Sequence, residues 1–166
     1  MSYYGISPLS FESVSAVTAT PTPGLDLGTE RIVAGEKYRY VYSLGQISPG
    51  YGATYSGTSG NSVAATGVVS GEHCAGFCKH ATLTTGTYGW LLVKGVVDSY
   101  NGMTNSAPAD GDVVYLTTDG KFRSGKGAPA TSATDFVGGY AVGKVLSAGA
   151  SGGTGASLSL LFVNVP

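Results

Sequence analysis

The sequence has few charged residues and no long apolar run. Charged side chains make up 11% of its 166 residues, against roughly 25% in an ordinary soluble domain. Nine basic and ten acidic residues give a formal net charge of −1, and neither sign forms a block. Nucleic acid and anionic membranes both attract basic patches, so we expect neither as a partner. No stretch approaches the ~18 uninterrupted apolar residues that a membrane-spanning helix needs.

The first residues also lack the features of a secretion signal. The segment "MSYYGISPLSFESVSAVTAT" (1–20) has no basic start and no continuous apolar core. No N-x-[ST] glycosylation acceptor occurs anywhere in the chain. We therefore expect a soluble protein that is made in the cytoplasm.

Glycine, in contrast, is abundant, and it argues against helices. The chain contains 27 glycines, and its longest stretch without Gly or Pro runs only from Leu9 to Thr20. Each glycine inside a helix costs about 1 kcal/mol, so helices longer than about three turns are not expected. The chain is long enough for one domain with its own core.

Alternating and β-branched segments predict several short strands. In "KYRYVYS" (37–43) three tyrosines alternate with other residues, which is the period of a half-buried strand. Asp119 and Gly120 suit the turn of a hairpin within 111–122. Further strands are predicted in 87–97, 136–146 and 157–165. This pattern predicts an all-β fold, a small sandwich or barrel with Gly-rich loops and little helix.

Residues 1–30 do not fit a compact β domain, and we expect them to form an extended arm in front of a single β domain over 31–166. Pro21 and Pro23 favour extended backbone and cannot donate ladder hydrogen bonds. The aromatic residues of this arm are Tyr3, Tyr4 and Phe11. An ordered terminus has to lie on some surface. A neighbouring subunit is the preferred surface, and the arm's own domain is the alternative.

Both cysteines and both histidines lie in "HCAGFCKH", residues 73–80. On one straight strand Cys74 and Cys78 share a face, with Cα atoms about 13 Å apart. A disulfide needs Cα atoms within about 7 Å and zinc needs ligands about 2 Å away, so only a tight turn at Gly76 would join the sulfurs. Free thiols are the preferred interpretation, and no metal is assigned. A disulfide, zinc or an intersubunit site remains an alternative.

Two short motifs suggest chemistry, and both are incomplete. The segment "GKFRSGKG" (120–127) follows the phosphate-binding P-loop until Gly127 replaces the hydroxyl residue that holds magnesium. The segment "GASGG" (149–153) matches the nucleophile elbow of hydrolases, but both histidines precede it. We interpret both as loops. No catalytic or cofactor-binding residue is assigned, and we expect a protein that is not an enzyme.

Four stretches of the chain carry a recognisable pattern. They are "LGTERIVAGEKYRYVYSLG" (27–45), "GTYGWLLVKGVV" (86–97), "ADGDVVYLTTDGKF" (109–122) and "VGGYAVGKVLSAGASGGTGASLSLLFV" (137–163). The first combines a leucine-glycine start with a tyrosine-rich strand, and the others share patterns of glycine and apolar residues. In these stretches the chain resembles the capsid decoration, or cement, proteins of tailed bacteriophages.

The resemblance implies a non-enzymatic virion protein that binds the outer surface of an icosahedral capsid and bridges neighbouring capsomers. Its partners would be the major capsid protein and sister copies in a homodimer or homotrimer. The predicted interface residues are Tyr3, Tyr4, Phe11, Tyr88 and Trp90. Such rings bury large areas, although core packing of Tyr88 and Trp90 is equally compatible with the sequence. The alternative function is a phage fibre, spike or carbohydrate-binding receptor module.

Overall fold

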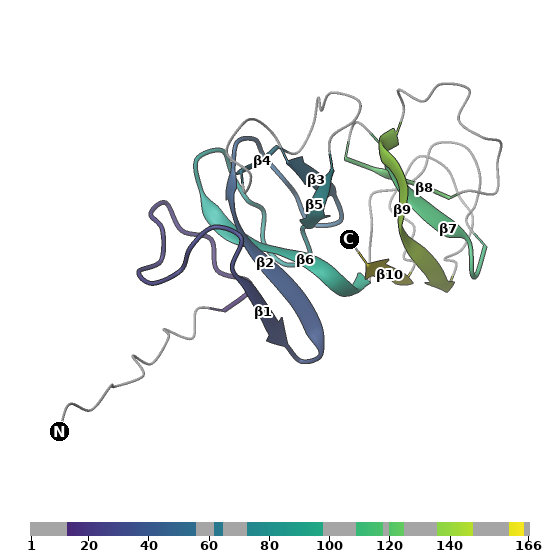
Figure 1. The fold of residues 1–166 in the computed structure, drawn as a ribbon, viewed down its shortest axis with the longest axis horizontal. Coiled ribbons are helices and arrows are strands. Elements are labelled where there is room, and N and C mark those ends of the chain that lie inside the picture. Colours follow the sequence, from purple (N-terminus) through teal and green to yellow (C-terminus); the bar gives the residue numbers. More distant parts are fainter. Residues whose placement is uncertain are drawn as a thin grey trace.

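The computed structural model describes residues 13–55, 62–64, 73–97, 109–117, 120–124, 136–147 and 160–164. Within these ranges the chain forms ten strands and no helix, so the predicted all-β class is confirmed (Figure 1). None of this described part could cross a membrane as a helix. The strands are β1 (Glu30–Val33), β2 (Glu36–Ser43), β3 (Gly52–Tyr55), β4 (Ser62–Ala64), β5 (Cys74–Phe77), β6 (Tyr88–Val97), β7 (Val113–Thr117), β8 (Phe122–Ser124), β9 (Phe136–Ser147) and β10 (Leu160–Asn164).

Five strands are joined by backbone pairings that close on themselves. Strand β2 pairs with β6 on one side, antiparallel, and with β4 on the other, parallel. Strand β4 pairs with β3, β3 with β5, and β5 with β6. We call these five strands the ring. A closed ring of pairings is the connectivity of a small barrel, so it favours the barrel over the sandwich, a choice that stays a prediction.

The sheet continues from the ring through β10, β9, β7 and β8, and β1 lies at its other end. Strands β7 and β8 form the predicted antiparallel hairpin. This hairpin packs on the ring, because Phe122 stacks on Phe77 with ring centroids 4.9 Å apart. The N–H of Gly52 also donates to the carbonyl of Gly120 at 2.9 Å. Figure 1 shows β7, β8 and β9 to the right of the ring, with the β1–β2 hairpin extending below it.

Two cores fill the molecule. The inner core draws on four strands of the ring, so we place it inside the ring, where small side chains suit the narrow space. It consists of Val41, Ile47, Ala53, Ala75, Cys78, Leu83 and Leu91. The outer core links the outer face of the ring to strands β7 to β9. Its largest side chains are Tyr38, Tyr40, Phe77, Trp90, Leu92, Leu116 and Phe122.

Strand β2 is buried on both faces, whereas the sequence predicts a half-buried strand. Its residues do alternate as predicted: Tyr38 and Tyr40 belong to the outer core, and Val41 belongs to the inner core. Ring closure covers the face of Val41, and residues 13–29 cover the tyrosine face. Lys37 lies on the same face as Val41 but outside the enclosed part, near the end of the hairpin with β1.

Residues 13–29, the described part of the predicted arm, pack on their own domain. Thr18 and Tyr88 exchange backbone hydrogen bonds of 3.0 and 2.8 Å. The N–H of Thr22 donates to the hydroxyl of Tyr40 at 3.0 Å. Three apolar side chains, Val14, Leu25 and Leu27, contact the outer core. This arrangement is the alternative that the sequence leaves open, and it is favoured because the tyrosine face of β2 needs a cover.

Candidate functional site

Residues 73–80, which hold the cysteines and histidines, contain strand β5 (Cys74–Phe77), and this strand carries a bulge. Gly76 has a φ of +145°, and the pairing of β5 with β3 shifts its register beside this residue. A Cβ at Gly76 would lie 2.9 Å from both the Cβ of Leu91 and the carbonyl oxygen of Leu92. Only glycine fits this close approach of β5 and β6. Gly76 therefore marks a bulge, not a tight turn.

The bulge puts the two cysteines into different cores, so the predicted shared face is wrong. Cys74 belongs to the outer core with Phe77, whereas Cys78 belongs to the inner core with Ala75. One extra residue shifts the alternation and reverses the faces of the residues that follow it. Both thiols are buried and free, as the sequence favours.

Burial makes these thiols unreactive. It raises the pKa of Cys74 to about 12 and the pKa of Cys78 to about 11. The thiolate is the form that attacks electrophiles, so the raised pKa values disfavour nucleophilic attack by either side chain at neutral pH. Among the described residues, no group of three His, Cys, Asp or Glu side chains is placed to hold a metal ion.

The histidines of this segment lie at the surface, and His80 joins a polar network. Its ring stacks on Tyr38 with centroids 5.7 Å apart, and its Nε2 lies 3.0 Å from the Tyr38 hydroxyl. Partial burial of the ring lowers the pKa of His80, and the charge of Lys79 lowers it further. The imidazole is therefore mostly neutral at pH 7. His73 is exposed.

Glu36 is the centre of this network. Its Oε1 accepts hydrogen bonds from Lys79 Nζ at 2.7 Å and from the N–H of Val96 at 3.0 Å. Its Oε2 accepts from Lys79 Nζ at 2.8 Å and from the Tyr38 hydroxyl at 2.6 Å. Because that hydroxyl gives its one proton to Glu36, Nε2 of His80 has to be the donor toward Tyr38. We call these groups the Glu36 network.

The hydrogen bonds of Glu36 join β2 to β6 and to Lys79, so the Glu36 network acts as a structural clamp. Burial alone would raise the pKa of Glu36, but the hydrogen bonds from Lys79, Tyr38 and Val96 outweigh it and lower the pKa below its usual range. Burial and the nearby carboxylate raise the pKa of Tyr38 well above its ordinary value. The carboxylate stays ionised and fully engaged at neutral pH. The network therefore fixes β2 against β6 and residue 79.

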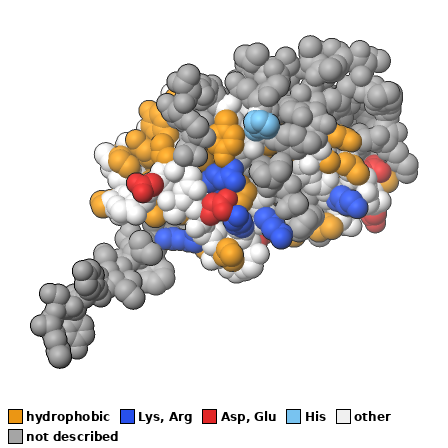
Figure 2. All heavy atoms as spheres, in the orientation of Figure 1, with side chains coloured by type: hydrophobic (Ala, Val, Ile, Leu, Met, Phe, Trp, Pro, Cys, Tyr) orange, Lys and Arg blue, Asp and Glu red, His pale blue; other side chains and the backbone are white. Residues whose placement is uncertain are grey.

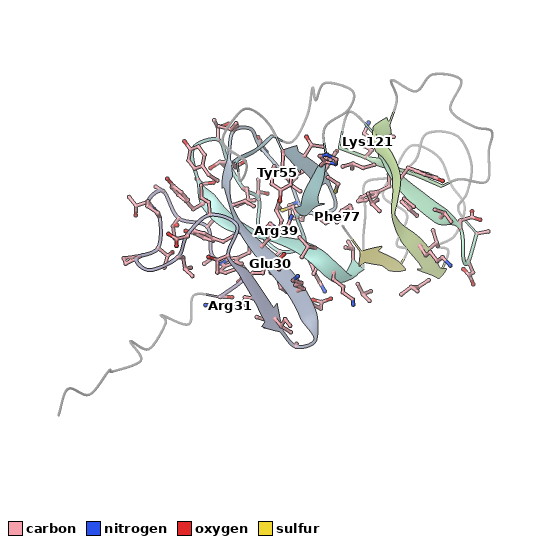
Figure 3. The ribbon with its side chains drawn as sticks, in the orientation of Figure 1. Glu30, Arg31, Arg39, Tyr55, Phe77 and Lys121 are labelled. Carbon is pink, nitrogen blue, oxygen red and sulfur yellow. The ribbon has the colours of Figure 1, made fainter. Side chains whose placement is uncertain are left out.

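A second polar group lies at one end of the inner core. The guanidinium of Arg39 donates to Glu30 Oε1, from Nη2 at 3.0 Å and from Nε at 3.3 Å, and Nη1 donates to the hydroxyl of Tyr55. Lys37 pairs with the same carboxylate and lowers the pKa of Glu30, and Arg39 lowers it further against the effect of burial. Figure 3 shows Glu30, Arg39 and Tyr55 gathered from β1, β2 and β3. These ion pairs hold β1 in place.

Two of the predicted interface aromatics, Trp90 and Tyr88, lie among the described residues, and both contact other rings. Trp90 is 4% exposed, and its ring lies 5.1 Å from that of Tyr40 and 5.0 Å from the guanidinium carbon of Arg31. Tyr88 is half-buried, with its ring 4.9 Å from that of Tyr42. The structure brings Trp90 and Tyr88 together on one face of β6, where other side chains cover Trp90 and part of Tyr88 stays exposed. The remaining predicted residues, Tyr3, Tyr4 and Phe11, lie outside the described residues.

The β1–β2 hairpin exposes apolar side chains that the sequence argument missed. Ile32 is 73% exposed and Val33 is 37% exposed. The turn consists of Ala34 and Gly35, both with positive φ (+51° and +83°), as in a tight two-residue hairpin loop. Figure 2 shows hydrophobic surface at this tip with Lys and Arg side chains beside it. The sequence feature that could have indicated this hairpin is the two-residue loop, Ala34 and Gly35, between "ERIV" and "EKYR".

A scan of the chain against protein-family models finds no match, and a search of the curated proteins finds no relative.

Proposed function

We propose that this protein is a non-enzymatic virion protein that binds the outer surface of an icosahedral phage capsid and stabilises the shell by bridging capsomers. The resemblance of four sequence stretches to capsid decoration proteins supports the proposal. The all-β body with an exposed apolar hairpin tip supports it from the geometry.

The observation that carries the proposal is the apolar tip of the β1–β2 hairpin. Covering Ile32 would gain about 25 cal/mol for each Å² of apolar surface removed from water. The two-residue turn and the ion pairs of Glu30 already order the tip, so binding costs little conformational entropy. The ordered, apolar tip of the β1–β2 hairpin is therefore suited to bind a capsid lattice whose subunits keep fixed positions.

Attachment to a shell also explains how a modest contact could have a large effect. A protein that binds only the assembled shell stabilises that shell by mass action. Copies that are linked to one another on a lattice gain further through avidity. Major capsid protein and sister copies of this chain are the proposed partners, and Tyr3, Tyr4 and Phe11 stay the candidates for contacts beyond the hairpin.

The test is a titration of expanded, undecorated capsids of the same phage with purified protein. Pelleted capsids should carry a saturating number of copies that matches a class of lattice positions, and the decorated shells should melt at a higher temperature. A small unrelated β protein of similar net charge serves as the control, because the amount of it in the pellet measures non-specific trapping of protein with the capsids. A protein that ignores capsids but binds host cells or glycans would overturn the proposal in favour of a receptor-binding module.

A further inference from the structure

Three residues on neighbouring strands form a row on one face of the sheet. Ile32 on β1 lies opposite Lys37 on β2, and Lys37 lies opposite Lys94 on β6. Residues directly opposite each other point to the same face of a sheet, so Lys37 and Lys94 lie on the face that carries the exposed side chain of Ile32. Lys37 is paired with Glu30, whereas Lys94 is exposed.

The surroundings of this row carry an excess of positive charge. We call the hairpin tip and the charged residues around it the hairpin patch. Its members on the face of the row are Ile32, the cations Lys37, Arg39 and Lys94, and the carboxylate Glu30. Three cations against one carboxylate give this face of the patch +2, whereas the whole chain carries −1.

Glu30 and the nearby Glu36, which lies on the other face of the hairpin, are already engaged. Glu30 is shared by Lys37 and Arg39, and Glu36 accepts from Lys79, a backbone N–H and a tyrosine hydroxyl. They act as internal counterions that hold the strands together. Lys94 is exposed and forms no ion pair with any described residue. Lys94 can therefore form an ion pair with an acidic group of another molecule.

An apolar centre beside cations favours a particular kind of partner surface. Burying Ile32 in a depression would exclude water, and ion pairs at the edge of a dry contact are stronger than ion pairs in bulk solvent. Nucleic acid would pair with the lysines but would leave Ile32 without an apolar contact. A folded protein surface can offer both an apolar depression and carboxylates at its rim.

We infer that the hairpin patch docks on an acidic surface of the capsid shell, with Ile32 in an apolar depression and Lys37 and Lys94 facing carboxylates. This inference rests on the proposed function, and it names the chemistry of the partner surface. It predicts attachment that weakens with salt, because part of the contact is electrostatic.

The test measures the affinity of full-length variants for undecorated capsids. Ile32→Ser and Lys94→Glu should each weaken attachment at least about tenfold, which corresponds to about 1.4 kcal/mol. Leu146 is 49% exposed and Lys144 is exposed, both on β9, so Leu146→Ser and Lys144→Glu are matched controls expected to stay within about twofold of wild type. The wild-type affinity should fall as salt rises, and Lys94→Gln should flatten that dependence.

The outcomes separate the inference from the proposed function. If the wild type does not attach to capsids, the proposed function fails. If the wild type attaches and Ile32→Ser and Lys94→Glu attach equally well, only the hairpin inference fails. Loss of attachment in the β9 controls as well would also overturn the inference, because the effect would not belong to the patch. Anionic vesicles and duplex DNA serve as further probes. Tighter binding to either than to capsids would overturn the inference, because the hairpin patch would then bind a membrane or nucleic acid instead of the capsid shell.

Discussion

Residues 73–80 and residues 30–37 contrast in what their sequences suggest and in what the structure does with them. The first segment holds both cysteines and both histidines, yet its thiols are buried in two separate cores. The second consists of ordinary strand residues, yet it exposes Ile32 and presents Lys37 next to Lys94. Residue type indicates chemistry only where the side chain can be reached. Strand register and burial decide whether a side chain can be reached. Four predictions test whether residues 73–80 are structural and residues 30–37 are accessible.

The largest effect on stability is expected from Gly76→Ala in the first segment. The new Cβ would clash with Leu91 and with the carbonyl of Leu92, and the φ of +145° is unfavourable for alanine. Strain and overpacking together should cost about 3 kcal/mol in the free energy of unfolding, measured by urea denaturation. Gly24→Ala is the matched control, because Gly24 has a φ of +80° but nothing within 4 Å of its Cβ position, and it should cost about 1 kcal/mol. If Gly76→Ala and Gly24→Ala lowered the free energy of unfolding equally, the close approach of strands at the Gly76 bulge would be contradicted.

Glu36→Gln should have the next largest effect. It removes the ionised acceptor of Lys79, Tyr38 and Val96 and should cost about 2 kcal/mol at pH 7. Glu30→Gln, which breaks more exposed ion pairs, should cost less than about 1 kcal/mol.

The effect of Glu36→Gln should also depend on pH. The pKa of Glu36 is lower in the folded protein than its ordinary value of 4.5, so its stabilising contribution is complete above that value and is lost as the pH falls through the folded pKa. The difference in unfolding free energy between wild type and Glu36→Gln should therefore shrink as the pH falls below 4.5. A difference that is constant over this range would contradict the clamp.

The thiols of the first segment should have a smaller effect on stability and a clear kinetic signature. Cys74→Ala should cost about 1 kcal/mol, because it leaves only a small cavity. In the native protein both thiols should react with Ellman's reagent at pH 8 at least about 100-fold more slowly than in urea, since burial raises the pKa values to about 12 and about 11. Fast labelling of either thiol in the folded protein would show that it is accessible after all.

The smallest effect on stability is expected in the second segment. Ile32→Ser should change the free energy of unfolding by less than about 0.5 kcal/mol, because the side chain is 73% exposed. The same variant should lose attachment to capsids. A large loss of stability would mean that Ile32 belongs to the fold, and the contrast between the two segments would then disappear.

The sequence predicts much of the strand content because local alternation and turn residues carry it. The predicted segments 37–43, 87–97, 136–146 and 157–165 contain strands β2, β6, β9 and β10 or nearly all of them, and 111–122 contains β7 and the start of β8. The all-β class follows from these elements. Strand β1 was missed, because its alternation is short and its loop, Ala34 and Gly35, is not one of the strongest turn signals.

The features that the sequence could not give depend on contacts between distant residues. The bulge at Gly76 is set by Leu91 and Leu92 on β6, and without that contact a straight strand was the simplest interpretation of residues 73–80. The closed ring depends on the parallel pairing of β2 with β4. The packing of residues 13–29 depends on the face of β2 that carries Tyr38 and Tyr40, which these residues shield from solvent. In the same way, the burial of Trp90 depends on Tyr40 and Arg31.

The most direct test of the account is a density map of decorated capsids obtained by electron cryomicroscopy. The account predicts that copies occupy a regular class of lattice positions and that the β1–β2 hairpin points into the shell, with Ile32 in an apolar depression beside acidic side chains. A map in which the hairpin points to solvent while another surface contacts the shell would contradict the docking inference. Capsids that show no added density at saturating protein would contradict the proposed function itself.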